Sequence, residues 1–209
     1  MIKKNQTISI VNYGLGNLHS IKNVIAKIGG SATIIDHVSD LKNAEKIILP
    51  GIGAFDHGMH FLKQKGWIEA LNEAALQKQI PILGICLGMQ LMCTQSQEGT
   101  LPGLGWFDAQ VVKFNMPIGS VNKIPHMGWN AIAVKKSNPL IIDKNEEQRF
   151  YFVHSYHVAC NNANDILATA THEYEFVAAI SHNNLFATQF HPEKSHRFGM
   201  ELLTHFLAI

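Results

Sequence analysis

Residues 80–90 read IPILGICLGMQ, an apolar run that is interrupted by Gly84, Cys86 and Gly88. The run Ile80–Ile85 is typical of a fully buried strand, and the residues that follow the thiol favour a helix. One glycine lies two residues before Cys86 and another two residues after it. The pattern predicts an abrupt strand-to-helix turn, because the absence of Cβ at both flanking positions makes room for the backbone and for a substrate.

The thiol at this turn is a candidate nucleophile. The spacing Gly-x-Cys-x-Gly equals that of the nucleophile elbow of the α/β-hydrolases. Unpaired N–H groups at a helix N-terminus favour a thiolate, and the amide of Leu87 would face a developing oxyanion. Free cysteines are more often inert core residues, so this alternative stays open for Cys86 and is preferred for Cys93 and Cys160.

The N-terminal half repeats this alternation of strand and helix. Between the first two strands, apolar residues from Leu18 to Ile28 recur at helical spacing, with Asn17 as the N-cap and Gly29–Gly30 as the end. Such alternation predicts parallel βαβ units. The expected strands before Ile80 are Thr7–Val11, Ala32–Ile35 and Lys46–Leu49.

From Trp106 onward the pattern changes to shorter strand-like runs joined by turns, which favours a partly antiparallel region. A final helix is predicted over Lys194–Ala208, with Phe198, Leu202 and Phe206 toward the core. The sequence thus predicts one α/β domain over residues 1–209, with a mostly parallel central sheet flanked by helices. The expected later strands lie around Val111–Val112, Ile132–Val134, Phe150–Val153, Asp165–Thr171, Phe176–Ile180 and Leu185–Phe190.

Composition narrows the classes of function. The 209 residues are 46% hydrophobic and 16% charged, enough for one sizeable core. Seventeen basic and sixteen acidic residues provide no electrostatic source for nucleic-acid binding, so a small polar metabolite is the expected ligand. No apolar run approaches the roughly 20 residues that span a bilayer, and three cysteines do not suggest a disulfide framework. We therefore expect a cytoplasmic protein.

A cysteine nucleophile needs a base, and twelve histidines compete for that role. The stretch Phe190-His191-Pro192-Glu193 offers a base and its orienting group together. Pro192 disfavours the α conformation at His191, and in an extended segment residues i and i+2 project to the same side. A hydrogen bond between His191 and Glu193 would fix the tautomer and leave one ring nitrogen for the Cys86 proton.

His-x-Glu alone is weak, since a surface histidine beside a solvated glutamate is the commoner case. It is also half of a zinc-deaminase signature, but that signature needs Pro-Cys-x-x-Cys downstream and no cysteine follows Cys160. The histidines around His154–His157 lack the spacing of metal ligands. We expect no metal and no cofactor.

Six ordered motifs complete the sequence reading. They are Asn12–Leu18, Leu49–Phe55, Gly84–Leu91, Pro125–Asn130, Tyr151–Tyr156 and Gln189–Ser195. Through these motifs nearly the whole chain resembles the class I, triad-type glutamine amidotransferases. Within that family it is most similar to the glutaminase subunits of imidazole glycerol phosphate synthases, enzymes of histidine biosynthesis.

The resemblance implies a flavodoxin-like fold and a Cys86–His191–Glu193 triad that forms a γ-glutamyl thioester. It also implies that the Leu87 amide is one oxyanion donor and that the loop Gly51-Ile52-Gly53 supplies another. A peptide N–H in that loop must turn toward the substrate, and the two glycines ease the turn because they tolerate positive φ.

The resemblance further assigns a glutamine pocket and a partner face. The partner is a TIM-barrel synthase subunit in a heterodimer, which uses the ammonia to cleave and cyclise a phosphoribosyl-linked aminoimidazole carboxamide intermediate. From the residues alone, Trp129 fits ordinary core packing. The pocket positions are Gln90, His154, Ser155 and Tyr156, and the partner-facing positions are Asn12, Asn17, Trp129 and Lys194.

The sequence departs from the family pattern at three places. Asn12 stands where the motif usually carries Asp, His19 where Arg is expected, and Trp106–Gln110 lacks a glycine expected before the next strand. The alternatives left open are a paralogous glutaminase that feeds another synthase, such as one for surface-polysaccharide sugars, and a non-catalytic assembly module. Glutaminases of pyridoxal phosphate synthases carry Gly-Gly-Glu-Ser where this chain has Gly51–Ala54.

Overall fold

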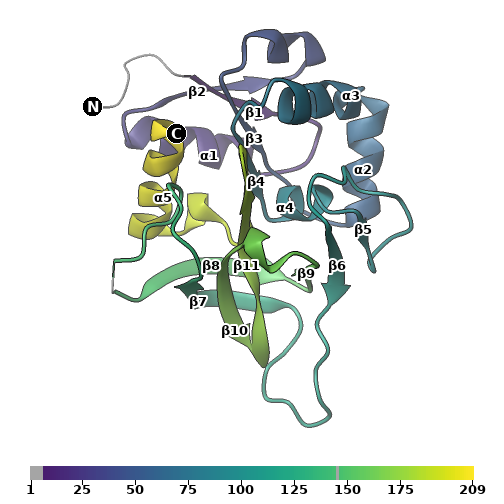
Figure 1. The fold of residues 1–209 in the computed structure, drawn as a ribbon, viewed down its shortest axis with the longest axis vertical. Coiled ribbons are helices and arrows are strands. Elements are labelled where there is room, and N and C mark those ends of the chain that lie inside the picture. The colour runs from purple at the N-terminus through teal and green to yellow at the C-terminus, as the bar shows by residue number, and fades with distance from the viewer. Residues whose placement is uncertain (1–6, 145) are drawn as a thin grey trace.

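The computed structural model describes residues 7–144 and 146–209, which form a twelve-stranded sheet with helices on its faces (Figure 1). The main path of the sheet runs β2-β1-β3-β4-β12-β11-β10-β7-β8, and β5, β6 and β9 form a branch that joins it through β11. The strands are β1 (Thr7–Val11), β2 (Ser31–Ile35), β3 (Lys46–Leu49), β4 (Ile82–Ile85), β5 (Gln95–Ser96), β6 (Ala109–Lys113), β7 (His126–Val134), β8 (Gln148–His154), β9 (Tyr156–Cys160), β10 (Ile166–His172), β11 (Tyr174–His182) and β12 (Leu185–Thr188). The α-helices are α1 (Leu18–Lys27), α2 (Phe55–Gln64), α3 (Trp67–Asn72), α4 (Leu87–Leu91) and α5 (His196–Ala208).

The sheet has a parallel part and an antiparallel part. Strands β2, β1, β3, β4 and β12 pair in parallel, as the alternation of strands and helices predicts. From β12 onward, each neighbouring pair along the main path is antiparallel. The mostly parallel sheet with an additional antiparallel β region is therefore confirmed.

Two hydrophobic clusters lie on opposite faces of the parallel strands. Successive strand residues point to opposite faces, so Ile10 of β1 joins one cluster and Val11 joins the other. The Ile10 cluster contains buried residues of α1 and α5, and the Val11 cluster contains buried residues of α2 and α3. Figure 1 shows these two helix pairs on either side of the central strands.

The predicted boundaries of β4, β12 and α5 were wrong. Strand β4 begins at Ile82, because the Ile80 N–H donates to the Ala74 carbonyl at 2.9 Å and Pro81 has no N–H to donate. Strand β12 ends at Thr188. Helix α5 begins at His196, because residues 192–194 form a separate 3-10 turn.

Helix α1 starts where the sequence predicts, but the predicted capping hydrogen bond is absent. Asn17 occupies the N-cap position, yet its side chain makes no hydrogen bond to the first turn. The helix begins at Leu18, and Ile21 and Ile25 are the residues of the helix that are buried. Burial of the apolar face therefore holds α1 in place without a side-chain cap.

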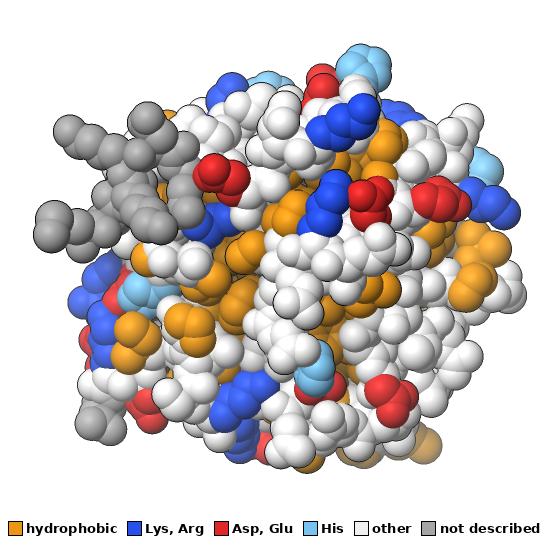
Figure 2. All heavy atoms as spheres, turned by 45° about the horizontal axis from the view of Figure 1, so that its top comes forward, with side chains coloured by type: hydrophobic (Ala, Val, Ile, Leu, Met, Phe, Trp, Pro, Cys, Tyr) orange, Lys and Arg blue, Asp and Glu red, His pale blue; other side chains and the backbone are white. Residues whose placement is uncertain are grey.

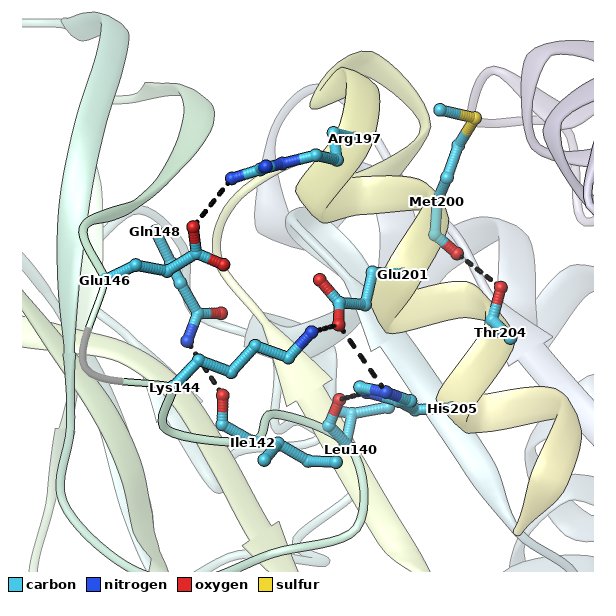
Figure 3. Close-up of polar contacts among 10 residues, drawn as sticks. All are labelled: Leu140, Ile142, Lys144, Glu146, Gln148, Arg197, Met200, Glu201, Thr204 and His205. Atoms are coloured by element: carbon cyan, nitrogen blue, oxygen red, sulfur yellow. Dashed lines mark hydrogen bonds and ion pairs between the residues drawn. The ribbon is translucent and has the colours of Figure 1, made fainter.

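Helix α5 is also tied to the segment before β8, as Figure 3 shows. Lys144 forms an ion pair with Glu201, Arg197 Nη2 lies 2.8 Å from Glu146 Oε2, and the His205 ring bonds to a backbone carbonyl of that segment. Surface ion pairs contribute at most about 1 kcal/mol each. The buried apolar residues of α5 therefore contribute more to its docking.

The surface in Figure 2 carries acidic and basic side chains that are interspersed, with apolar side chains between them. Such mixing agrees with the near-zero net charge of the sequence. Among the residues that the structure describes, no helix combines the length and the apolar character that crossing a membrane requires.

The α5 side of the core gives a test of stability. Leu203 is fully buried, whereas Leu76 is 57% exposed. We expect Leu203→Ala to lower the free energy of unfolding by about 2–5 kcal/mol, because it leaves a cavity, and the matched Leu76→Ala to change it by less than about 0.5 kcal/mol. Urea denaturation followed by circular dichroism measures both, and equal losses would contradict the packing of α5 described above.

Candidate active site

Cys86 lies at the sharp turn between β4 and α4. Its backbone has φ 55° and ψ −109°, a conformation that non-glycine residues rarely adopt. The Cys86 N–H donates to the Thr188 carbonyl at 2.8 Å, and the Gln90 N–H donates to the Cys86 carbonyl at 3.3 Å. The neighbouring strand and the helix thus hold the strained turn on both sides, as the flanking glycines predict.

The two glycines are required by close packing. A Cβ at Gly88 would lie 1.9 Å from the Leu49 carbonyl oxygen, which is far inside van der Waals contact. A Cβ at Gly84 would lie 2.9 Å from Met92 Sδ and 3.0 Å from the Gly88 carbonyl carbon. Only glycine lets the turn approach β3 this closely.

His191 and Glu193 form the hydrogen bond that the sequence predicts. His191 Nδ1 lies 2.8 Å from Glu193 Oε1, and both side chains are buried. His191 is extended, but Glu193 belongs to the 3-10 turn, so the two side chains meet across a turn and not along one strand. Because the carboxylate only accepts, Nδ1 carries the proton and Nε2 is left for chemistry.

The free nitrogen of His191 is available to Cys86. Burial lowers the pKa of His191, but the neighbouring Cys86 and Glu193 favour the imidazolium, outweigh burial and raise the pKa to about 9. Nε2 is buried and has no hydrogen-bond partner among the described residues. Since Glu193 occupies Nδ1, Nε2 is the nitrogen that remains for the predicted interaction with the Cys86 thiol.

A cavity of about 410 Å³ opens beside Cys86 and His191. It brings together the predicted nucleophile and base, the four predicted pocket residues and the predicted oxyanion residues other than Gly51, which does not line it. The side chain of Gln90 is fixed at the edge of the cavity, because its Nε2 donates to the Tyr156 carbonyl at 3.2 Å and to Gln189 Oε1 at 3.0 Å. The predicted residues that line the cavity are Ile52, Gly53, Cys86, Leu87, Gln90, His154, Ser155, Tyr156 and His191.

A larger hollow of about 600 Å³ is lined by residues between 134 and 143, which are the last residue of β7 and the segment that follows it. None of its lining residues belongs to the triad or to the predicted pocket. We place the candidate active site at the smaller cavity, because the predicted nucleophile Cys86 and the predicted base His191 line it.

The predicted oxyanion loop borders the same cavity. Gly53 has φ 94°, and Ile52 is 47% exposed. A Cβ at Gly51 would lie 2.8 Å from Leu87 Cβ and 3.0 Å from the Gly88 nitrogen. The loop therefore lies directly against the turn that carries the nucleophile, with glycine on both sides of its central residue.

Sequence reasoning missed Glu98, whose side chain also lines the cavity. Its Oε2 accepts a hydrogen bond of 2.8 Å from the Phe55 N–H, at the start of α2. The surrounding segment reads as a polar turn, and no local pattern connects it with a loop more than forty residues earlier.

The predicted partner-facing residues are at the surface or half-buried. Trp129 is 43% exposed and stacks on the His196 ring at 5.3 Å, so the expectation of ordinary core packing was wrong. It lies on the face of β7 opposite to the buried His126. Lys194 Nζ lies 5.8 Å from the Tyr151 ring centroid, and that ring also contacts Trp129.

The other two predicted partner residues lie in the segment between β1 and α1. Asn12 is half-buried and its Nδ2 donates to Asp36 Oδ1 at 2.6 Å, while Asn17 is exposed. Within residues 7–144 and 146–209, no three histidine, cysteine, aspartate or glutamate side chains converge as a metal site.

Comparison with known proteins places this fold and site in one class. The family model described as "Glutamine amidotransferase class-I" matches residues 9–209. The chain belongs to the class-I glutamine amidotransferase family. Among solved structures, PurLQS from Thermotoga maritima has a TM-score of 0.73 at 17% identity, covering 96% of this chain and 97% of that chain, which supports the fold.

Two relatives of high sequence identity carry more specific names than the family. The chain is 49% identical over 200 residues to "Imidazole glycerol phosphate synthase subunit HisH 2" of Methanococcus maripaludis, covering 96% of this chain and 98% of the relative. It is 42% identical over 202 residues to the protein of the same name from Pseudomonas aeruginosa, covering 97% and 99%.

The charge on Glu193 gives a test of the site. We expect Glu193→Gln to lower the pKa of His191 from about 9, because a neutral amide no longer stabilises the imidazolium. NMR titration of the imidazole measures this shift directly. A raised histidine pKa stabilises the folded state at a pH below the ordinary histidine pKa of about 6.5. This stabilisation is lost as the pH rises from about 6.5 to about 9.

The substitution should therefore cost more stability at the acidic end of that range than at the alkaline end. Glu175→Gln, which alters an exposed carboxylate of β11, is the matched control and should leave the His191 titration unchanged. An unchanged His191 pKa in the Glu193→Gln protein would contradict the assignment of Glu193 as the partner of the ring.

Proposed function

We propose that this chain is the cytoplasmic glutaminase subunit of an imidazole glycerol phosphate synthase, which releases ammonia from glutamine for a TIM-barrel synthase subunit in histidine biosynthesis. The observation that carries the proposal is that Cys86 and His191 line one cavity, with Glu193 bonded to the far side of the His191 ring, in a chain of this family. The names of the relatives support the identity of the synthase.

The proposed reaction uses the triad in two stages. The Cys86 sulfur attacks the side-chain amide carbon of glutamine, and its proton passes to His191 Nε2. The Leu87 N–H donates to the oxyanion of the tetrahedral intermediate. The carbon–nitrogen bond then breaks, His191 returns the proton to the leaving ammonia, and a γ-glutamyl thioester remains on Cys86.

Hydrolysis of the thioester completes the cycle. A water molecule gives a proton to His191 Nε2 and attacks the thioester carbon, and the departing Cys86 sulfur recovers the proton as glutamate is released. Glu193 does not exchange protons in this scheme, because it holds the ring and stabilises the imidazolium through Nδ1.

Charge in the cavity agrees with an amino-acid substrate. Glu98 places a carboxylate on the wall of the cavity, which suits the α-ammonium group of glutamine. The other walls carry the fixed amide of Gln90 and the segment around Ser155. A cavity of about 410 Å³ accommodates a ligand of this size.

A partner surface is supported by exposed apolar side chains. Of the nine large exposed hydrophobic residues among those described, five fall between residues 118 and 129, in the loop before β7 and on β7 itself. They are Ile118, Val121, Ile124, Met127 and Trp129. Exposed apolar side chains gathered in this way are typical of protein–protein interfaces. A sealed interface is also needed because ammonia becomes protonated in bulk water and loses its nucleophilic lone pair.

Replacement of the nucleophile separates the glutaminase from the synthase reaction. We expect Cys86→Ala to abolish glutamine-dependent synthesis of imidazole glycerol phosphate by the complex, because no thioester can form. Synthesis from added ammonium salt at raised pH should persist, since the later chemistry belongs to the partner. Product formation from each nitrogen source is the measurement.

Cys93→Ala is the matched control, because Cys93 is buried and does not line the cavity. Equal loss of both activities in Cys86→Ala would mean that the thiol has a structural role. If the wild-type chain supports ammonia transfer only to another synthase, the paralogous glutaminase is the correct function.

A second prediction concerns dependence on the partner. A triad with only the Leu87 donor has half an oxyanion hole, and one such donor is worth on the order of 100- to 1000-fold in rate. We therefore expect the isolated chain to be a poor glutaminase and kcat to rise by about this factor with the ligand-bound synthase, because an interface can supply coupling of a few kcal/mol.

The change in KM should be smaller, since the added donor stabilises the transition state more than bound glutamine. Glutamate release is measured for the chain alone, with the synthase, and with the synthase plus an acceptor analogue. Full turnover by the chain alone would favour a free-standing glutaminase.

A further inference from the structure

Tyr13 lies directly beneath the loop Gly51-Ile52-Gly53. The residue is fully buried, and its hydroxyl donates to the Pro50 carbonyl oxygen at 2.8 Å. A Cβ built on Gly51 would lie 2.5 Å from the same hydroxyl oxygen. The tyrosine therefore supports the first peptide of the loop from below and contacts it closely.

The hydroxyl remains a donor over the range in which the enzyme works. Burial raises the pKa of Tyr13 far above its ordinary value, and the nearby Cys86 raises it further. Because the proton points at the Pro50 carbonyl, it is not available to the substrate oxyanion. The role of the hydroxyl is therefore to hold a peptide and not to touch the reacting atoms.

The other end of the loop is also held. The Phe55 N–H donates to Glu98 Oε2 at 2.8 Å, where α2 begins. The next residue, Asp56, accepts from the N–H groups of Thr100 and Leu101 at 2.9–3.0 Å, which ties α2 to the segment that carries Glu98. Between the two anchors, Gly53 already has positive φ and Ile52 is exposed.

We propose that Tyr13 is a positioning residue for catalysis: its hydroxyl fixes the Pro50–Gly51 peptide, so that only the peptides on either side of Ile52 turn to complete the oxyanion hole. This inference rests on the proposed function, because it assumes that the loop supplies an oxyanion donor. A peptide plane joins the Pro50 carbonyl to the Gly51 N–H, so the hydrogen bond to the carbonyl fixes both groups.

Loss of the hydroxyl has a specific consequence. A buried carbonyl without a donor is unfavourable, so the Pro50 carbonyl in a Tyr13→Phe protein rotates toward another partner. The loop then has an additional soft peptide, and the conformation that completes the oxyanion hole becomes a smaller fraction of the population. Formation of the thioester slows, while the thiol and its base are unchanged.

Two reactions of Cys86 distinguish this role from a general structural one. Acylation by glutamine, followed as the pre-steady-state release of ammonia, passes through an oxyanion. Alkylation by iodoacetamide displaces iodide and has no oxyanion. In the complex with the synthase, we expect Tyr13→Phe to slow acylation roughly tenfold, with KM and the alkylation rate both within about twofold of wild type.

Tyr174→Phe is the matched control, because its hydroxyl bonds to His157 and to the Asn115 N–H and does not contact the loop. Both rates should stay at the wild-type level in this protein. Wild-type acylation in Tyr13→Phe, or equal slowing of both reactions, would overturn the inference. Absence of glutaminase activity in wild type would instead reject the proposed function.

A crystal structure of the wild-type complex, acylated by a glutamine analogue, tests the same inference without a substitution. The Pro50 carbonyl should remain on the Tyr13 hydroxyl while a peptide next to Ile52 has turned. Separation of the Pro50 carbonyl from the hydroxyl would overturn the proposal even if the Tyr13→Phe protein failed to fold.

Discussion

The backbone of Cys86 is held at φ 55° and ψ −109°, and the geometry of the site depends on this one strained residue. A conformation of this kind costs on the order of 1–3 kcal/mol and persists only where its surroundings fix it. Here β12 accepts the Cys86 N–H at Thr188, and the absence of a side chain at Gly88 lets the turn pack against Leu49. The sheet therefore sets the direction of the thiol before any substrate arrives.

The order of the parallel strands explains why the parts of the site meet. Strands β3, β4 and β12 are neighbours, and the carboxyl ends of parallel strands lie at one edge of a sheet. The predicted oxyanion loop follows β3, Cys86 follows β4 and His191 follows β12. The antiparallel part adds another wall, because the turn between β8 and β9 contributes Ser155 to the cavity. Residues separated by as many as 140 positions are thus assembled by strand order alone.

The sequence predicts features that depend on interactions within a few residues and does not predict features that depend on contacts between distant segments. Strand β1 and strand β3 have the predicted bounds, and the His191–Glu193 bond was predicted, because apolar runs and a proline act within a few residues. The burial of Trp129 was predicted wrongly and Glu98 was missed, because both depend on contacts between segments far apart in the sequence. The exposure of Trp129 depends on which face of β7 packs inward, and the position of Glu98 depends on its contact with the start of α2. Neither relation leaves a local pattern.

The parts of the candidate site differ in the free energy that a rearrangement would cost. Removing one member of a buried charged pair costs about 3–5 kcal/mol, so the His191–Glu193 pair is a poor element to switch. A peptide between two glycines turns at much lower cost, because glycine tolerates both signs of φ. The exposed Ile52 lies between such glycines and borders the cavity. The His191–Glu193 pair is therefore costly to rearrange, whereas the peptides on either side of Ile52 can turn at low cost.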